Sequence, residues 1–274
     1  MIRIIYIFLI LFFNLYADGA YEYKIGNKLK AIQSFETECN LNISQSCSNL
    51  AIIYDKGDGI KEDNEKSLKL YEKACELGSG EACYNLALKY DIGDELIEDN
   101  DKAIGLYTLS CNLNINEACY NLAVIYDEDE SKKINKLLAK DFYDKACKLN
   151  NIEACYNLGV FYILGTGVKK DSFKASELFA KACNSGNSMG CYNLAFLFLT
   201  GDGVKENKIV ANKLYTALCN TNFTLACYNL GVMYSEGDGV IQNKSKAKDL
   251  YKKSCDDKNE EACIEYKNLI KQGF

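Results

Sequence analysis

Small, apolar and aromatic residues recur along this chain in two helical patterns, and both patterns repeat every 36 residues. In the first pattern a cysteine is followed four residues later by Ala or Gly and seven residues later by an aromatic residue, as in Cys155, Gly159 and Tyr162. Residues at i, i+4 and i+7 share one face of a helix. The first pattern therefore predicts one helix in each repeat.

The second pattern places Ala, an aromatic residue and a cysteine at intervals of four residues, as in Ala139, Tyr143 and Cys147. These three positions form one stripe and predict a second helix in each repeat. A loop such as Gly201-Asp202-Gly203-Val204 joins the first helix to the second, and its first glycine suits the left-handed residue that ends a helix. A fixed period of this length predicts an all-α array of stacked helix pairs.

The cysteines follow the same period. Seven of them stand 36 residues apart, and each has a partner eight residues later. An even number of cysteines at constant spacing predicts a disulfide in each repeat, joining the end of a second helix to the start of the next first helix. Each bridge closes a short loop and stabilises the fold by about 2.5 kcal/mol in the chain-entropy model. The predicted pairs are Cys39–Cys47, Cys75–Cys83, Cys111–Cys119, Cys147–Cys155, Cys183–Cys191, Cys219–Cys227 and Cys255–Cys263.

The N-terminal residues indicate the compartment. A short segment with one positive charge, Arg3, precedes an apolar run from Ile4 to Leu15, and Ala17 offers a small residue for cleavage. We interpret residues 1–17 as a secretory signal peptide and residues 18–274 as the repeat array, with an uncleaved N-terminal anchor as the alternative. Export to the periplasm or the exterior supplies the oxidising setting that the cysteines need, and no stable membrane span is expected after cleavage.

Composition excludes several classes of function. The chain has no His, no Trp and no Pro, and its only Arg is Arg3. Without residues 1–17, 31 Lys stand against 38 acidic residues, a net charge of −7, so we expect no binding to nucleic acid. Without His and with every cysteine paired, a Ser/His/Asp system, a thiolate nucleophile and a zinc site are not expected. We expect no metal and no cofactor.

The repeat unit carries a family resemblance. The run Ala154-Cys155-Tyr156-Asn157-Leu158-Gly159, the glycine loop and the cysteine that closes the second helix resemble the Sel1-like repeat, a relative of the tetratricopeptide repeat. The cysteine pair in every unit resembles the secreted Helicobacter cysteine-rich protein family. This resemblance covers the chain from about residue 20 to its end. It implies seven Sel1-like units with short caps, wound as a right-handed α/α superhelical solenoid whose first helices line the concave face.

The resemblance also implies an activity, because members of that family are catalogued as β-lactamases and penicillin-binding proteins. A serine β-lactamase needs an activated nucleophile beside a base. The only Ser-x-x-Lys sequence is Ser245-Lys246-Ala247-Lys248, and neither Ser-Asp-Asn nor Lys-Thr-Gly accompanies it. Ser245 falls at the predicted start of a second helix, so the catalytic residues stay unknown. Lactam hydrolysis or penicillin binding is the alternative function that the family implies.

A row of asparagines is the candidate binding site. One Asn stands two residues after the second cysteine of most units, and its amide can both donate to a carbonyl and accept from an N–H. If the first helices line a groove, the row could bind the backbone of an extended peptide, a protein partner, a cell-wall peptide or a β-lactam. With equal weight, each Asn could instead bond the neighbouring unit and fix the stacking. The residues are Asn85, Asn121, Asn157, Asn193 and Asn229, with Asn49 in the first unit.

Overall fold

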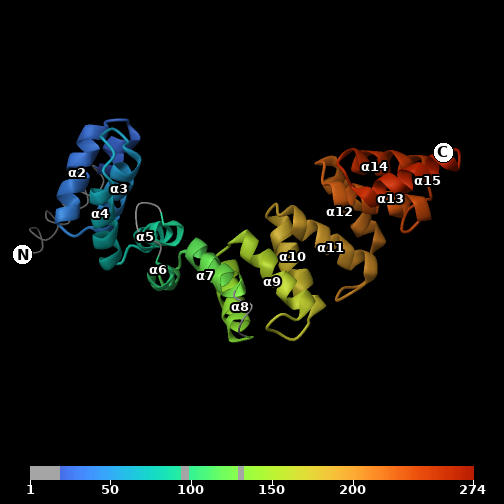
Figure 1. Ribbon diagram of the computed structural model, residues 1–274, viewed down its shortest axis with the longest axis horizontal. Coiled ribbons are helices and arrows are strands. Elements are labelled where there is room, and N and C mark those ends of the chain that lie inside the picture. Colours follow the sequence, from blue (N-terminus) through green and yellow to red (C-terminus); the bar gives the residue numbers. More distant parts are fainter. Residues whose placement is uncertain (1–18, 94–98, 129–132) are drawn as a thin grey trace, which may run out of the picture. The chain divides into compact units, whose positions relative to one another are not determined.

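The computed structural model describes residues 19–93, 99–128 and 133–274. The predicted signal peptide, residues 1–17, lies outside the described residues. The chain divides into two compact units, residues 1–122 and residues 123–274, and the boundary falls inside one helix. In the described residues every regular element is a helix, as the repeat pattern predicts (Figure 1).

The first unit begins with a helical turn over residues 19–24. Consecutive helices then pack in pairs, α2 on α3, α3 on α4, α4 on α5 and α5 on α6. Their bounds are α2 Lys28–Asn40, α3 Ser44–Lys56, α4 Asn64–Glu76, α5 Gly80–Ile92, α6 Asn100–Asn112 and α7 Asn116–Glu128, the last of which continues into the second unit.

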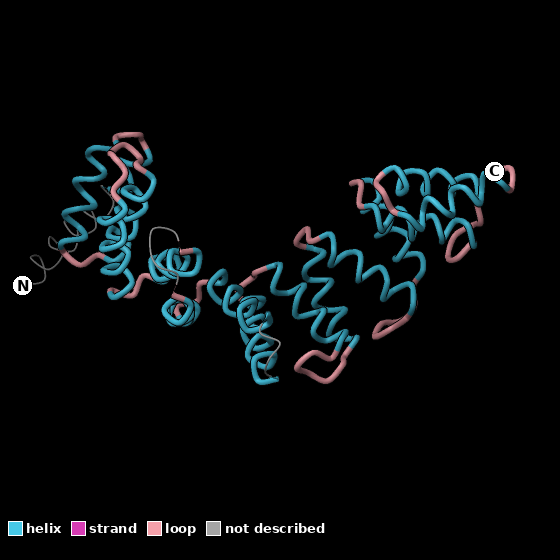
Figure 2. The backbone as a smooth tube through the Cα atoms, viewed as in Figure 1, coloured by secondary structure: helices cyan, strands magenta, loops and turns pink. Residues whose placement is uncertain are grey.

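The second unit continues the same alternation, with α8 on α9 and so on to α14 on α15 (Figures 1 and 2). Its helices are α8 Lys133–Lys148, α9 Ile152–Leu164, α10 Ser172–Asn184, α11 Ser188–Thr200, α12 Lys208–Asn220, α13 Thr224–Glu236, α14 Lys244–Asp256 and α15 Glu260–Lys271. Odd-numbered helices are the first helices of the repeats and even-numbered helices are the second helices. In the described part of the chain no helix is both long and apolar enough to span a membrane.

Local sequence sets the helix ends. The side chain of Asp171 accepts from the N–H of Lys174 at 3.0 Å and caps α10, and Asn187 caps α11 in the same way. The first helices α3, α5, α9, α11 and α13 end at a glycine in the left-handed region, such as Gly201 at φ 74°, as the loop pattern predicts. At Gly203 an added Cβ would lie 2.2 Å from the carbonyl carbon of Ser172, so this close loop contact requires glycine.

The core consists of the residues that repeat at helical spacing. The aromatic residue of each second helix is fully or almost fully buried, including Tyr107, Tyr143, Phe179 and Tyr215. Each packs between helices against small residues such as Ala195, which is also buried. Burial of one such side chain contributes about 1.5–3 kcal/mol, so the repeated aromatics account for a large part of the packing energy.

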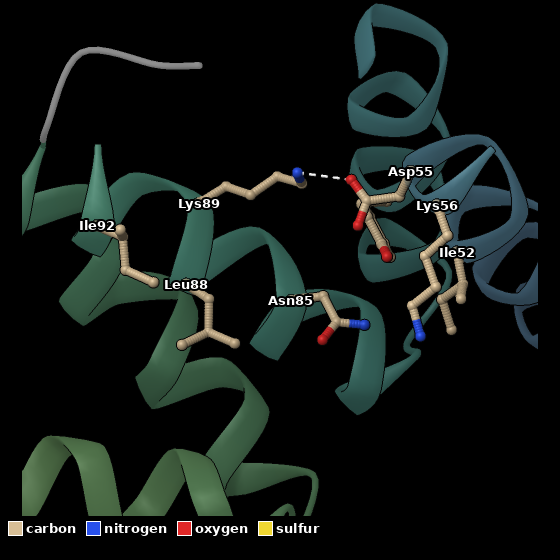
Figure 3. A pocket seen from close by; sticks show the side chains of 8 residues that line it. Ile52, Asp55, Lys56, Asn85, Leu88, Lys89 and Ile92 are labelled. Carbon is tan, nitrogen blue, oxygen red and sulfur yellow. Dashed lines mark ion pairs between the residues drawn. The ribbon is translucent and has the colours of Figure 1, made fainter. Parts of the chain in front are cut away.

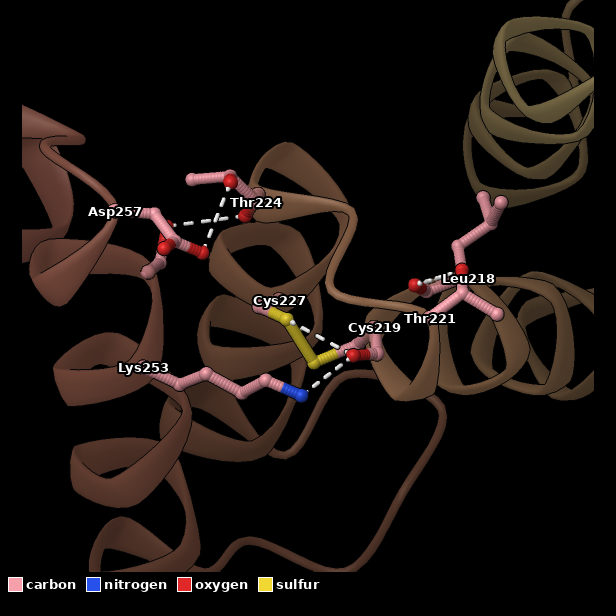
Figure 4. The surroundings of a disulfide bond; sticks show 8 residues. Leu218, Cys219, Thr221, Thr224, Cys227, Lys253 and Asp257 are labelled. Carbon is pink, nitrogen blue, oxygen red and sulfur yellow. Dashed lines mark hydrogen bonds between the residues drawn. A yellow bond between two sulfur atoms is a disulfide. The ribbon is translucent and has the colours of Figure 1, made fainter.

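The expectation of one disulfide in each repeat is confirmed, and the bonds join cysteines eight residues apart. A lysine two residues before the first cysteine adds a contact between repeats. Lys253 Nζ donates to the carbonyl oxygen of Cys219 at 2.7 Å (Figure 4), and Lys73 and Lys181 make the same contact to Cys39 and Cys147. Because the last carbonyls of a helix lack partners within the helix, this lysine caps the preceding second helix.

Candidate binding face

The asparagines lie on one exposed stripe of the first helices. Each stripe has four residues, one per turn, and the Asn is the second of them. The third residue is apolar in every stripe. The stripes read Gln45, Asn49, Ile52, Lys56 on α3; Glu81, Asn85, Leu88, Ile92 on α5; Glu153, Asn157, Val160, Leu164 on α9; Met189, Asn193, Phe196, Thr200 on α11; and Leu225, Asn229, Val232, Glu236 on α13. We call the surface that the stripes form the ladder face.

Neighbouring stripes contact each other. Gln45 Nε2 on α3 donates to the side chain of Asn49 at 3.3 Å and to Glu81 on α5 at 3.5 Å. In the second unit Asn229 Nδ2 on α13 donates to the hydroxyl of Tyr192 on α11 at 3.0 Å. The stripes of α3 and α5 therefore contact each other in the first unit, and in the second unit the α13 stripe contacts α11 through Tyr192, beside the α11 stripe.

A pocket of about 350 Å³ lies on the ladder face between α3 and α5 (Figure 3). Stripe residues form most of its wall. Tyr71 of α4 and the charged pair Asp55 and Lys89 complete the wall. The stripe residues that line it are Ile52, Lys56, Asn85, Leu88 and Ile92.

The charged pair crosses this pocket. Lys89 Nζ lies 2.6 Å from Asp55 Oδ1, and both side chains are largely buried. The Ser67 hydroxyl also donates to Asp55 at 3.3 Å. Burial raises the pKa of Tyr71, the charge of Asp55 raises it further, and the Asn85 amide opposes the rise. The pocket thus combines one anion, two ammonium groups, a neutral phenol and an amide.

A second pocket, of about 230 Å³, lies on the other side of α3. Asn49 and Ile52 line it together with Phe35 of α2 and Tyr23 of the N-terminal turn. Ile52 belongs to both pockets. Each of these two pockets therefore contains one asparagine of the row and at least one apolar residue from the third stripe position.

Some of the asparagines also contact tyrosine hydroxyls, the kind of contact that the stacking interpretation invokes. Besides the bond from Asn229 to Tyr192, the Asn121 amide donates toward Tyr84 and Tyr107 and opposes the rise that burial causes in the pKa of each hydroxyl. Asn85, Asn157 and Asn193 are, like Asn121 and Asn229, partly exposed. An asparagine of the row can therefore contact a neighbouring repeat and still be accessible to solvent.

Sequence reasoning missed two sets of residues. One is the apolar third position of each stripe, which the 36-residue period marks as clearly as the asparagines. The other is an aspartate near the end of a first helix that accepts from the tyrosine of the following second helix. Tyr107 donates to Asp91 at 2.9 Å, and Tyr143 donates to Asp127 at 3.4 Å. Where Phe179 replaces the tyrosine, Ile163 replaces the aspartate.

The Ser-x-x-Lys sequence lies at a helix start, as expected. Ser245 is the second residue of α14, and the preceding Asn243 caps that helix by accepting from Lys246 N–H at 2.9 Å. Lys246 Nζ contacts the hydroxyl of Tyr234 at 2.7 Å. Across the described ranges, no cluster of His, Cys, Asp or Glu has the arrangement of a metal site.

Known structures share this architecture. A protective antigen of uropathogenic Escherichia coli with the same repeat fold aligns at a TM-score of 0.76 and 24% identity; the match covers 88% of this chain, which spans only 52% of that protein. A Sel1 repeat protein from Oxalobacter formigenes aligns at a TM-score of 0.66 and 23% identity over 88% of this chain and 98% of its own. These likenesses show the fold.

A shorter match is closer in sequence. Helicobacter pylori cysteine-rich protein B is 33% identical over 47% of this chain and 93% of its own length, with a TM-score of 0.37. No curated protein matches the sequence. The Sel1 repeat itself matches at residues 44–79, 80–115, 116–151, 152–187, 188–220 and 224–259, most of the chain. Together with the helix pairs and the disulfide in each repeat, these matches show that the chain belongs to the Sel1 repeat family.

Proposed function

We propose that this protein is a scaffold, stapled by disulfides and working outside the cytoplasm, that binds an extended peptide or protein segment along its ladder face. The observation that carries the proposal is the pocket between α3 and α5, where Asn85 lies beside the apolar residues Ile52 and Leu88. An amide offers a donor and an acceptor to a peptide backbone, while apolar neighbours accept side chains. Repeat proteins commonly bind partners on such extended surfaces.

The disulfides support an oxidising compartment, because bonds of this number do not persist among reduced cytosolic thiols. Export through a cleaved signal peptide at residues 1–17 is part of the proposal. A cell-wall peptide is one ligand of suitable chemistry, since it offers the same backbone groups. The charged pair Asp55 and Lys89 adds a polar anchor at one end of the first unit.

The test uses the full-length protein and a library of capped random peptides, with retained peptides quantified by mass spectrometry. Asn85→Ala and Asn193→Ala should each weaken retention by about 1 kcal/mol, the value of one hydrogen bond. The matched control is Asn184→Ala, an exposed position at the end of α10 that lies off the ladder face. Equal retention by all variants, or no retained peptide at all, would reject the proposal. Nitrocefin turnover by the same preparation would instead favour the lactam-hydrolysing alternative.

A further inference from the structure

The eight repeat positions that line the pocket between α3 and α5 recur on α11, α12 and α13 in the second unit. Four of those positions change chemistry, and one of the four is Ile92, whose counterpart is Glu236. Asp55, Lys56 and Lys89 of the first unit correspond to Leu199, Thr200 and Met233. Tyr71 and Asn85 keep their identities as Tyr215 and Asn229. The second site therefore lacks the three charges of the first site, has one carboxylate at the end of the α13 stripe, and retains the phenol and the amide.

The ladder face around this second site is apolar and exposed. Phe196 is 49% exposed, Met189 39% and Leu225 42%, and all three belong to the stripes of α11 and α13. Leu164, at the end of the α9 stripe, is 69% exposed. In the stripes of the first unit the positions of Met189 and Leu225 hold Gln45 and Glu81. Glu236, at the end of the α13 stripe, is the one charged residue of these two stripes, so most of this surface can bury apolar side chains of a ligand.

A buried hydroxyl beside this surface lacks an acceptor. Tyr107 and Tyr143 donate to aspartates, but Leu199 stands at the corresponding position for Tyr215. Tyr215 is 0% exposed, and within the described part of the chain no group accepts the proton of its hydroxyl. The Asn229 amide lies close enough to oppose the rise that burial causes in the Tyr215 pKa, but an N–H in that role donates to the hydroxyl and does not accept its proton. Most buried hydroxyls are paired, so an unused donor at this point indicates a partner from outside.

We propose that the α11–α13 section of the ladder face binds an uncharged, apolar stretch of extended polypeptide, and that the Tyr215 hydroxyl donates to one backbone carbonyl of that ligand. This inference rests on the proposed peptide-binding function and adds the ligand class. The equivalent Tyr71 lines the pocket of the first unit, so the tyrosine at this repeat position lies beside the ladder face. Because Tyr215 is enclosed, binding requires the neighbouring Asn229 side chain to change rotamer, and its partial solvent access permits the change.

The experiment passes a library of capped random peptides over immobilised full-length protein and sequences the retained pool. The intact protein should enrich peptides rich in Leu, Ile, Val and Phe. Phe196→Ser and Tyr215→Phe should each lower that apolar enrichment about fivefold, the factor that corresponds to one hydrogen bond or its equivalent in buried area. The matched control is Phe173→Ser, which removes a phenylalanine that is 59% exposed on α10, away from the stripes, and should leave the enrichment unchanged.

The outcomes separate the two proposals. Retained peptides whose apolar content is unaffected by Phe196→Ser or by Tyr215→Phe would overturn this inference while leaving peptide binding intact. Equal losses in Phe173→Ser would also overturn it, because the effect would then be general surface hydrophobicity. No retention by any form would overturn the proposed function and this inference together. Melting curves by circular dichroism confirm that each variant is folded, and Tyr215→Phe, which keeps the ring, should melt no lower than the parent.

Discussion

Lys253 of α14 reaches across one repeat and donates to the carbonyl oxygen of Cys219, the residue whose sulfur closes the disulfide with Cys227 (Figure 4). The same side chain therefore caps the helix that the disulfide anchors. The disulfide and the lysine hydrogen bond, which both link neighbouring repeats, thus involve the same residue, Cys219. This arrangement explains why a lysine recurs two residues before several of the first cysteines.

Replacement of Lys253 by Met should lower the free energy of unfolding by about 1–2 kcal/mol, because the carbonyl of Cys219 loses a charged donor at a partly buried position. Chemical denaturation measures the change. Lys252→Met is the matched control: Lys252 is more than half exposed and pairs with Asp256 on its own helix, so the loss there should stay below about 0.5 kcal/mol. Equal losses would show that the bond to the carbonyl contributes nothing specific.

The disulfides predict a simple mass-spectrometric pattern. Digestion of the unreduced protein should yield the linked pairs eight residues apart and no free thiol. The double variant Cys219→Ala/Cys227→Ala should lose about 2.5 kcal/mol of stability, since the unfolded chain regains the entropy of one short loop. Linkages between distant repeats would contradict the prediction.

The contribution of the aspartate–tyrosine hydrogen bonds to stability can be tested, because another repeat of the chain has Ile and Phe at the same two positions. Asp91→Ile should cost about 1–3 kcal/mol, because the buried hydroxyl of Tyr107 loses its acceptor. Adding Tyr107→Phe reproduces the pair Ile163 and Phe179 and should restore most of the loss. Thermal melting of the two variants measures both changes. A double variant as unstable as the single one would show that the hydrogen bond is not the cause.

Alkaline pH should destabilise the protein. Burial raises the pKa of Tyr251 to about 12 and raises the pKa of Tyr71, Tyr107 and Tyr215. A tyrosine with a raised pKa in the folded state contributes its full stability below the ordinary pKa of about 10 and loses it as pH rises toward the folded value. Tyrosinate absorbance should therefore increase together with unfolding above about pH 10. Tyrosines that titrate fully before any loss of helix would contradict this.

Much of the fold could be predicted because the cysteines and the helical patterns share one period. The position of Asn85, Asn193 and their counterparts on a helix face also followed from that period. The apolar residue three places after each Asn was not predicted as part of the site, since an apolar residue at helical spacing is equally compatible with the core. The pairing of Asp55 with Lys89 depends on the separation of two helices, which local sequence does not encode.

The missing acceptor of the Tyr215 hydroxyl could be recognised only by comparing the hydrogen bonds of equivalent tyrosines in different repeats of the structure. In the sequence, Leu199 looks like an ordinary apolar substitution for aspartate. The bond from Tyr107 to Asp91 shows its effect: with Leu199 in place of the aspartate, the Tyr215 hydroxyl has no carboxylate to accept its proton. The physical signal is a missing acceptor, and a missing contact leaves no pattern in the sequence.

The most direct test of the ladder face as a peptide-binding surface is site-specific photocrosslinking. A benzophenone side chain placed at Leu88, in the wall of the pocket between α3 and α5, should crosslink to capped random peptides under illumination. The same group at Leu29, which is 68% exposed on α2 and does not line that pocket, should crosslink far less. Strong crosslinking at Leu88 with little at Leu29 is the result that the account predicts. Equal crosslinking at both positions, or crosslinking at Leu29 alone, would contradict it.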